Sequence, residues 1–190
     1  MEKLVHTHNF YFLTAVGLFL AVQLCMAGYF YLRRRRSSHV SWENLLARLS
    51  FTDRGNLTQV AMDLIDESGL PRQDDACSSI EPAQLWSLVG GLEGLKALEK
   101  NSEVLIALAF YVQQWHPEAV AVAETLRHDA RELRWHVARL NGAAQTGNLQ
   151  ISFPFYAQRA VATYYLMTRR VLSLYEAGNF AMLSDLQRAL

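Results

Sequence analysis

The sequence has few cysteines and none of the short motifs that mark the common enzyme families. Its two cysteines, Cys25 and Cys77, fall in an apolar run and in a polar loop, so we do not expect them to pair. This scarcity excludes a disulfide framework and fits a reducing cytosolic environment. The chain has no phosphate-binding Gly-Lys-Ser/Thr, no nucleophile elbow and no His-Glu-x-x-His. The sequence therefore predicts no catalytic residue and no cofactor, and it favours a protein that is not an enzyme.

Charged residues are absent from residues 10–32, where Gln23 is the only strongly polar side chain. As a helix, these 23 residues extend about 35 Å, which is enough to cross a hydrocarbon core ~30 Å thick. A helix in a globular core keeps a polar face, and a cleaved signal peptide has a shorter apolar region followed by a small-residue cleavage site. The run therefore predicts an uncleaved transmembrane helix over residues 10–32.

Basic charge lies on one side of this run. One lysine, Lys3, precedes it, whereas four consecutive arginines follow it directly: Arg33, Arg34, Arg35 and Arg36. The positive-inside rule then predicts a single-pass membrane protein with a cytoplasmic C-terminal side and a short outer tail at residues 1–9. Residues 33–41 are expected to form a basic juxtamembrane linker whose arginines contact anionic lipid of the bilayer.

The remaining residues, 42–190, are predicted to form one soluble domain, since ~150 residues rich in Leu, Ala, Val and aromatics can bury a single core. From Ser37 onward the chain carries 13 Lys and Arg against 17 Asp and Glu, a net charge of −4. This balance argues against nucleic acid as a partner.

No alternating strand pattern is present, and Ile151-Ser152-Phe153 is too short to build a sheet. Helical spacing of apolar residues predicts a series of helices. The first starts after the cap Ser41, the second starts after the cap Asn56 and ends at Gly69, and the third starts at Pro82. The later ones are predicted over Leu92–Leu98, Val104–Trp115, Pro117–Asn141 and Pro154–Ala177, and over Phe180–Leu190 after the cap Asn179. Gly90-Gly91 either ends a helix or kinks it. The fold class is therefore all-α: a transmembrane helix followed by a helical bundle with a long antiparallel helix pair.

Four residues spaced four apart in one predicted helix form the best metal candidate: Glu124, His128, Glu132 and His136. His and carboxylate ligands suit Zn or Fe. However, His128 and Glu132 point away from the apolar stripe, so a solvated face is the simpler interpretation and no metal site is predicted. A membrane-tethered helical enzyme or metal-binding protein remains the alternative hypothesis. His6 and His8 form a weaker second candidate.

Two surfaces are candidates for binding a partner. The first contains Arg131, Trp135, Arg159 and Arg170, because Trp135 lies opposite the apolar stripe of its helix and Trp and Arg dominate interface hot spots. Packing of Trp135 under a neighbouring helix is the simpler account of its position. The second is an acidic group at Asp63, Asp66, Glu67, Asp74 and Asp75, for which a plain solvated surface is the simpler account. The function that the sequence favours is a membrane-anchored helical scaffold or adaptor. Its expected partner at the cytoplasmic membrane surface is an unidentified protein or a second copy of the chain.

Overall fold

The computed structural model describes residue 14 and residues 16–28, 41–66, 79–113 and 115–190. The chain divides into two compact units, Met1–Val40 and Ser41–Leu190. In the first unit residues 16–28 are helical, and their large apolar side chains are exposed. Among the described residues, no helix has the length and apolarity needed to cross a membrane. The rest of the predicted span 10–32, together with the arginine block and both histidines of the N-terminal tail, lies outside the described residues.

The second unit is built from helices, as predicted, and no strand runs through its described residues. In chain order the helices are α2 (Trp42–Leu46), α3 (Arg54–Leu64), α4 (Pro82–Val89), α5 (Gly91–Val112), α6 (Ala119–Gln145), α7 (Leu149–Ala177) and α8 (Leu183–Ala189). The all-α bundle expected from the sequence is therefore confirmed.

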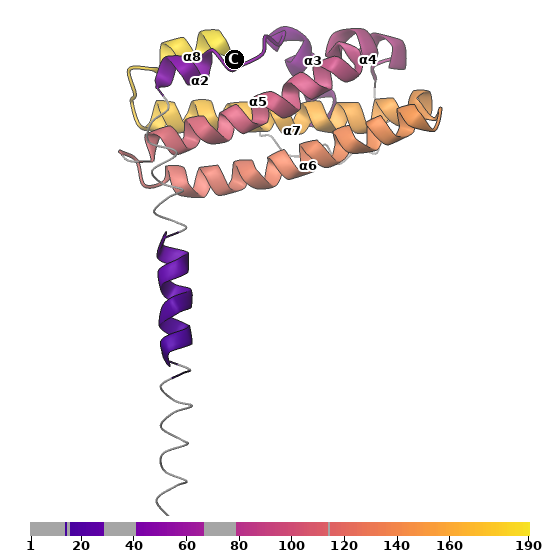
Figure 1. The fold of residues 1–190 in the computed structure, drawn as a ribbon. Helices are drawn as coiled ribbons and strands as arrows, with labels where there is room; N and C mark the ends of the chain where they lie inside the picture. The colour runs from indigo at the N-terminus through magenta and orange to yellow at the C-terminus, as the bar shows by residue number, and fades with distance from the viewer. Residues whose placement is uncertain (1–13, 15, 29–40, 67–78, 114) are drawn as a thin grey trace, which may run out of the picture. The chain divides into compact units, whose positions relative to one another are not determined.

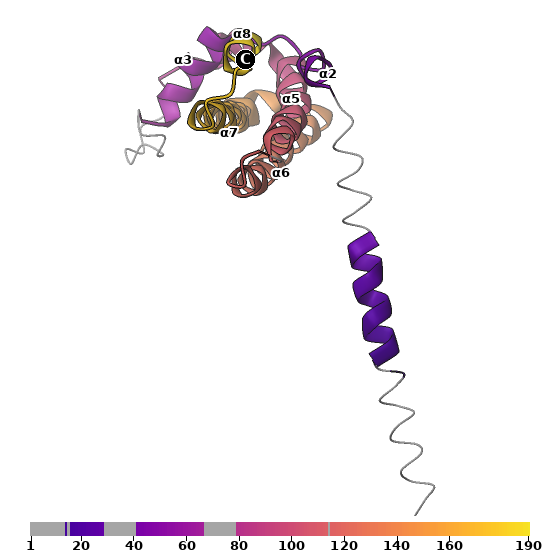
Figure 2. The ribbon, with the colours of Figure 1, turned by 90° about the vertical axis from the view of Figure 1, so that its left-hand side faces the viewer.

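Helices α6 and α7 form the long antiparallel pair, joined by a short turn in which Gly147 has a φ of 76° (Figure 1). Helix α5 packs against both of them, so that the three long helices make up the body of the bundle (Figure 2). Helix α7 also contacts α3, α4 and α8. It is thus the helix around which the unit is assembled.

The core is aliphatic along most of the bundle and aromatic at one end. The inner side of Val104–Val112 is fully buried, as its apolar run predicted, whereas Ile106 and Phe110 are only half-buried. At the start of the unit, the ring of Trp42 lies 5.8 Å from that of Tyr111 and 5.6 Å from that of Tyr175. Aromatic pairs at such distances stabilise a core by about 1 kcal/mol beyond the burial of their surface.

Helix α3 begins and ends earlier than its sequence predicted. Its N-cap is Asp53, whose carboxylate accepts a hydrogen bond from the backbone N–H of Asn56 at 3.1 Å. Asn56, the predicted cap, is therefore already inside the helix. The helix ends at Leu64, with Ile65 as its C-cap, before the predicted stop at Gly69. Both Asp and Asn make good caps, so the choice between two of them three residues apart was not determined by local preference.

Gly90 and Gly91 end α4 and start α5, which settles the question that the sequence left open. Both adopt positive φ, 75° and 62°, a backbone conformation that glycine adopts without strain. Gly94 then allows the helices to approach, since a Cβ at this position would lie 1.8 Å from the carbonyl oxygen of Val89. The two helices therefore meet at a sharp corner that depends on glycine.

Other predicted boundaries also differ from the structure. Helix α6 was predicted over Pro117–Asn141 but runs from Ala119 to Gln145. Helix α5 continues through Asn101, because the side chain of this residue bonds the backbone of Ser50 and does not compete with its own helix. Helix α7 starts five residues before Pro154, which lies inside the helix. Asn179 has a φ of 48° and belongs to the turn after α7, so it does not cap α8, which begins only at Leu183.

Candidate functional site

The face of α6 that packs on α7 contains two buried titratable residues. Five residues of this face recur at alternating steps of three and four, which is the spacing of a helix–helix seam: Leu126, Asp129, Leu133, His136 and Leu140. All five are buried. The predicted apolar stripe of this helix omitted Asp129 and His136 because they are polar. Their spacing relative to the leucines was the signal that could have located them.

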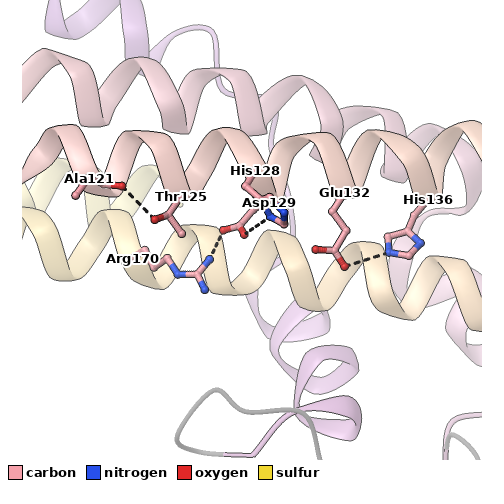
Figure 3. A network of polar contacts seen from close by, with 7 residues as sticks. All are labelled: Ala121, Thr125, His128, Asp129, Glu132, His136 and Arg170. Atoms are coloured by element: carbon pink, nitrogen blue, oxygen red, sulfur yellow. Dashed lines mark hydrogen bonds and ion pairs between the residues drawn. The ribbon is translucent and has the colours of Figure 1, made fainter.

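Asp129 pairs with Arg170 of α7 across this seam (Figure 3). Burial raises the pKa of the Asp129 carboxyl, and the neighbouring Arg170 opposes that shift without cancelling it. Removing one partner of a buried pair costs more than the pair itself contributes, because the other charge is left uncompensated. The pair links the two helices, with Asp129 buried and Arg170 partly exposed, and it engages an arginine that the sequence had assigned to a partner.

His136 lies two helical turns further along, with 3% of its surface exposed. Its Nε2 is 3.6 Å from Oε1 of Glu132 (Figure 3). This distance is too long for a hydrogen bond, and neither ring nitrogen makes one with a described residue. Burial lowers the pKa of His136; Glu132 opposes this shift and the charge of Arg159 adds to it. The imidazole is therefore held neutral, beneath a group of aromatic side chains.

These aromatic side chains reach the surface between α6 and α7. The ring of Trp135 lies 5.0 Å from His136 and 5.6 Å from Tyr156, and Phe155 lies 5.0 Å from Tyr156. Trp135 is 48% exposed and Phe155 is 53% exposed. Each ring is thus supported on one side by its neighbours and open to solvent on the other.

Two arginines lie over these exposed rings. The guanidinium carbon of Arg139 is 5.1 Å from the centre of the Trp135 ring, and that of Arg159 is 4.3 Å from the centre of Phe155. Both distances are within the range of cation–π attraction. A guanidinium stacked in this way still has N–H groups at its edge that can bind a carboxylate.

The surface is organised as two ridges, one on each helix, and we call it the aromatic–arginine surface. The α6 ridge is Arg131, Trp135 and Arg139, and the α7 ridge is Ile151, Phe155 and Arg159. Each ridge has four-residue spacing, which places its members on one helix face. All six residues are exposed, Ile151 to 84%. Tyr156 fills the space between the ridges.

The structure brings together some of the predicted partner-binding residues and separates one. Arg131, Trp135 and Arg159 all belong to the aromatic–arginine surface. Arg170 lies eleven residues beyond Arg159 on α7, about 16 Å along the helix, and its guanidinium is paired with Asp129. Sequence reasoning missed Arg139, Ile151 and Phe155, although their four-residue spacing from Trp135 and Arg159 was visible. The assignment of partner binding to this surface stays a prediction.

The candidate metal residues are not gathered into one site. His128 is exposed and Glu124 pairs with Arg127, while Glu132 contacts the buried His136. Among the described residues no three His, Cys, Asp or Glu side chains lie close enough to share a metal ion. His128 and Glu132 are exposed, as predicted, but His136 is buried in the seam.

One member of the acidic group has a structural role. The carboxylate of Asp63 accepts hydrogen bonds from the backbone N–H of Ser79 at 3.1 Å and from the side-chain amide of Gln158 at 2.5 Å. It therefore joins α3 to α7 and to the segment that precedes α4. Asp66 is described and half-buried. Glu67, Asp74 and Asp75 lie outside the described residues.

Comparison with models of known protein families, with curated proteins and with solved structures finds no match to this chain.

Proposed function

We propose that this protein is a single-pass membrane-anchored helical adaptor, which binds a protein partner at the cytoplasmic membrane surface through the aromatic–arginine surface. The observation that carries the proposal is the exposure of Trp135 and Phe155, 48% and 53%, on a rigid helix pair and beneath stacked arginines. Aromatic residues and arginine supply most of the binding energy at protein interfaces. Rings already supported by neighbours lose little conformational freedom on binding.

The anchor in this proposal is the uncharged run over residues 10–32. Residues 16–28 form a helix whose large apolar side chains are all exposed, and an apolar exterior of this kind needs lipid or protein around it. Tethering to a bilayer raises the effective concentration of the helical unit toward other membrane proteins. An adaptor benefits from this confinement without carrying out any chemistry.

Reporter fusions test the anchor and its orientation. A reporter that is active only in the cytoplasm, fused after Leu190, is expected to be active because the arginines Arg33 to Arg36 follow the run directly. A control fusion carries glutamates in place of these four arginines, which is expected to weaken or invert the orientation. Activity of an exported reporter at the same site would overturn the cytoplasmic assignment.

Affinity capture tests the partner-binding surface. The tagged full chain is extracted in a mild detergent and compared with its Trp135→Ala and Arg131→Ala variants. Trp115→Ala is the matched control, because Trp115 is also a half-exposed indole, 55% exposed, but lies at the end of α5. We expect a partner that is retained by the control and lost or strongly reduced in Trp135→Ala. Capture unchanged by both test substitutions excludes the surface, and the absence of any partner contradicts the adaptor function.

A further inference from the structure

The arginines of the aromatic–arginine surface are not ion-paired with any residue that the structure describes. Elsewhere on α6, Arg127 pairs with Glu124, and Arg134 pairs with two acids of α5, Glu99 at 3.3 Å and Glu103 at 3.1 Å. In the described part of the chain, by contrast, Arg131, Arg139 and Arg159 make no ion pair. Glu132, which follows Arg131 in the chain, contacts the buried His136 through its carboxylate. The surface therefore carries a local excess of cations.

This excess is held in a fixed geometry around an apolar centre. Arg139 stacks over the exposed ring of Trp135 and Arg159 stacks over that of Phe155, which fixes the position of both guanidinium groups. Planar guanidinium groups bind carboxylates through paired N–H donors. A complementary ligand thus needs an aliphatic or aromatic side chain at its centre and carboxylates on either side. The two ridges, each with four-residue spacing, suit a ligand that is itself helical.

We propose that the aromatic–arginine surface binds an acidic amphipathic segment of a partner protein, in which carboxylates flank an apolar side chain. This inference rests on the proposed adaptor function and names the chemistry of its partner. The chain from Ser37 onward has a net charge of −4, so an acidic ligand is repelled by most of the unit and attracted at this surface. The charge pattern therefore directs an acidic ligand to this surface rather than to other parts of the unit, and it also contributes to the affinity.

The same charges disfavour two other ligands of this surface, a second copy of the chain and an anionic membrane. Two copies of the chain that met symmetrically through this surface would place arginines against arginines, since both sides of such an interface are identical. An anionic membrane would attract the arginines, yet it would also repel the acidic remainder of the unit. A partner segment that carries its own carboxylates meets neither difficulty.

Selection from a random peptide library tests the proposal. The full chain in non-ionic detergent is used to select displayed peptides about four helical turns long, with counter-selection against an Arg139→Glu/Arg159→Glu double variant. We expect the enriched peptides to carry net negative charge around at least one aliphatic or aromatic residue. Binding of a synthetic copy is expected to fall by about tenfold or more in the double variant and to fall in Phe155→Ala. Trp115→Ala and Arg188→Glu, which alter exposed residues elsewhere, are expected to leave it unchanged.

Each other outcome contradicts the inference. Enriched peptides that are neutral or basic, or that bind the double variant equally well, show that acidic chemistry is not what the surface recognises. The same holds if no peptide is enriched while vesicles containing phosphatidylserine bind the native chain better than the Arg139→Glu/Arg159→Glu double variant, which keeps the arginines Arg33 to Arg36. Concentration-dependent dimerisation that is abolished by the double variant would assign the surface to a second copy. A captured partner that depends on Trp135 but competes with no acidic peptide overturns this inference and leaves the adaptor function intact.

Discussion

Replacing His136 with phenylalanine is expected to stabilise the protein, increasingly so at acidic pH. Neither imidazole nitrogen makes a hydrogen bond with a described residue, and a buried unsatisfied polar group costs about 1–3 kcal/mol. A phenyl ring preserves the contacts with Trp135 and Tyr156. The one extra ring atom and the lost contact with Glu132 offset part of this gain. We therefore expect the free energy of unfolding to rise by about 1 kcal/mol at neutral pH.

The pH dependence follows from the direction of the pKa shift. The pKa of His136 in the folded protein is lowered from its ordinary value of 6.5, chiefly by burial. At pH values well above 6.5 the histidine is neutral in both states and contributes no pH dependence. Below 6.5 the histidine binds a proton in the unfolded chain but not in the folded chain. The free energy of unfolding therefore decreases as the pH is lowered, until the lowered pKa of the folded protein is reached. The slope is at most ~1.4 kcal/mol per pH unit, and the variant lacks it.

Urea unfolding of the full chain in detergent, followed by far-UV circular dichroism between pH 7.5 and 5, measures both effects. His128→Gln is the matched control, since His128 lies on the same helix but is exposed. The control is expected to retain the pH dependence of the native protein. If His136→Phe also retained that dependence, or were destabilised at acidic pH, the neutral buried imidazole would not be the cause.

Three further predictions concern the bundle itself. Asn101→Ala removes two side-chain hydrogen bonds to Ser50, each 2.8 Å long, and is expected to lower the free energy of unfolding by about 2 kcal/mol, whereas unchanged urea unfolding would refute this role. Gly94→Ala drives a Cβ into the backbone of α4 and is expected to cost about 3 kcal/mol, while the control Gly142→Ala, with open space around its Cβ, should gain about 0.5–1 kcal/mol in the same assay. Residues 42–190 expressed alone are expected to be soluble and helical, and a dominant strand signal in circular dichroism would contradict this.

Helix content and helix pairing were predictable because they depend on the repeat of apolar residues. The leucines of α6 and the broad apolar face of α7 recur every three to four residues, and such a repeat has few structural solutions other than packed helices. Helix ends were less predictable, because several good caps stand close together. Asp53 rather than Asn56 caps α3, a difference that depends on which backbone N–H groups the rest of the fold leaves unpaired.

The candidate site was predictable in part for a different reason. Trp135 was recognised from its position opposite an apolar stripe, which is a property of one helix, and Arg159 was chosen as an arginine that shares a face of the next helix with Arg170. The pairing of Arg170 with Asp129 and the burial of His136 depend on how α6 and α7 are aligned with each other. The periodicity of one helix does not indicate how that helix is aligned with its neighbour. Polar residues inside a helix–helix seam are therefore the part of such a site that requires the structure.

Photo-crosslinking in intact cells tests the central claim most directly, namely that the aromatic–arginine surface is where a partner binds. Benzoylphenylalanine is introduced in place of Ile151, which is 84% exposed within the surface, or in place of Phe51, which is 93% exposed in the connection between α2 and α3. We predict a crosslinked partner from position 151, lost in the Arg139→Glu/Arg159→Glu background, and none from position 51. Crosslinking that is equal at the two positions, or present only at position 51, would contradict the account.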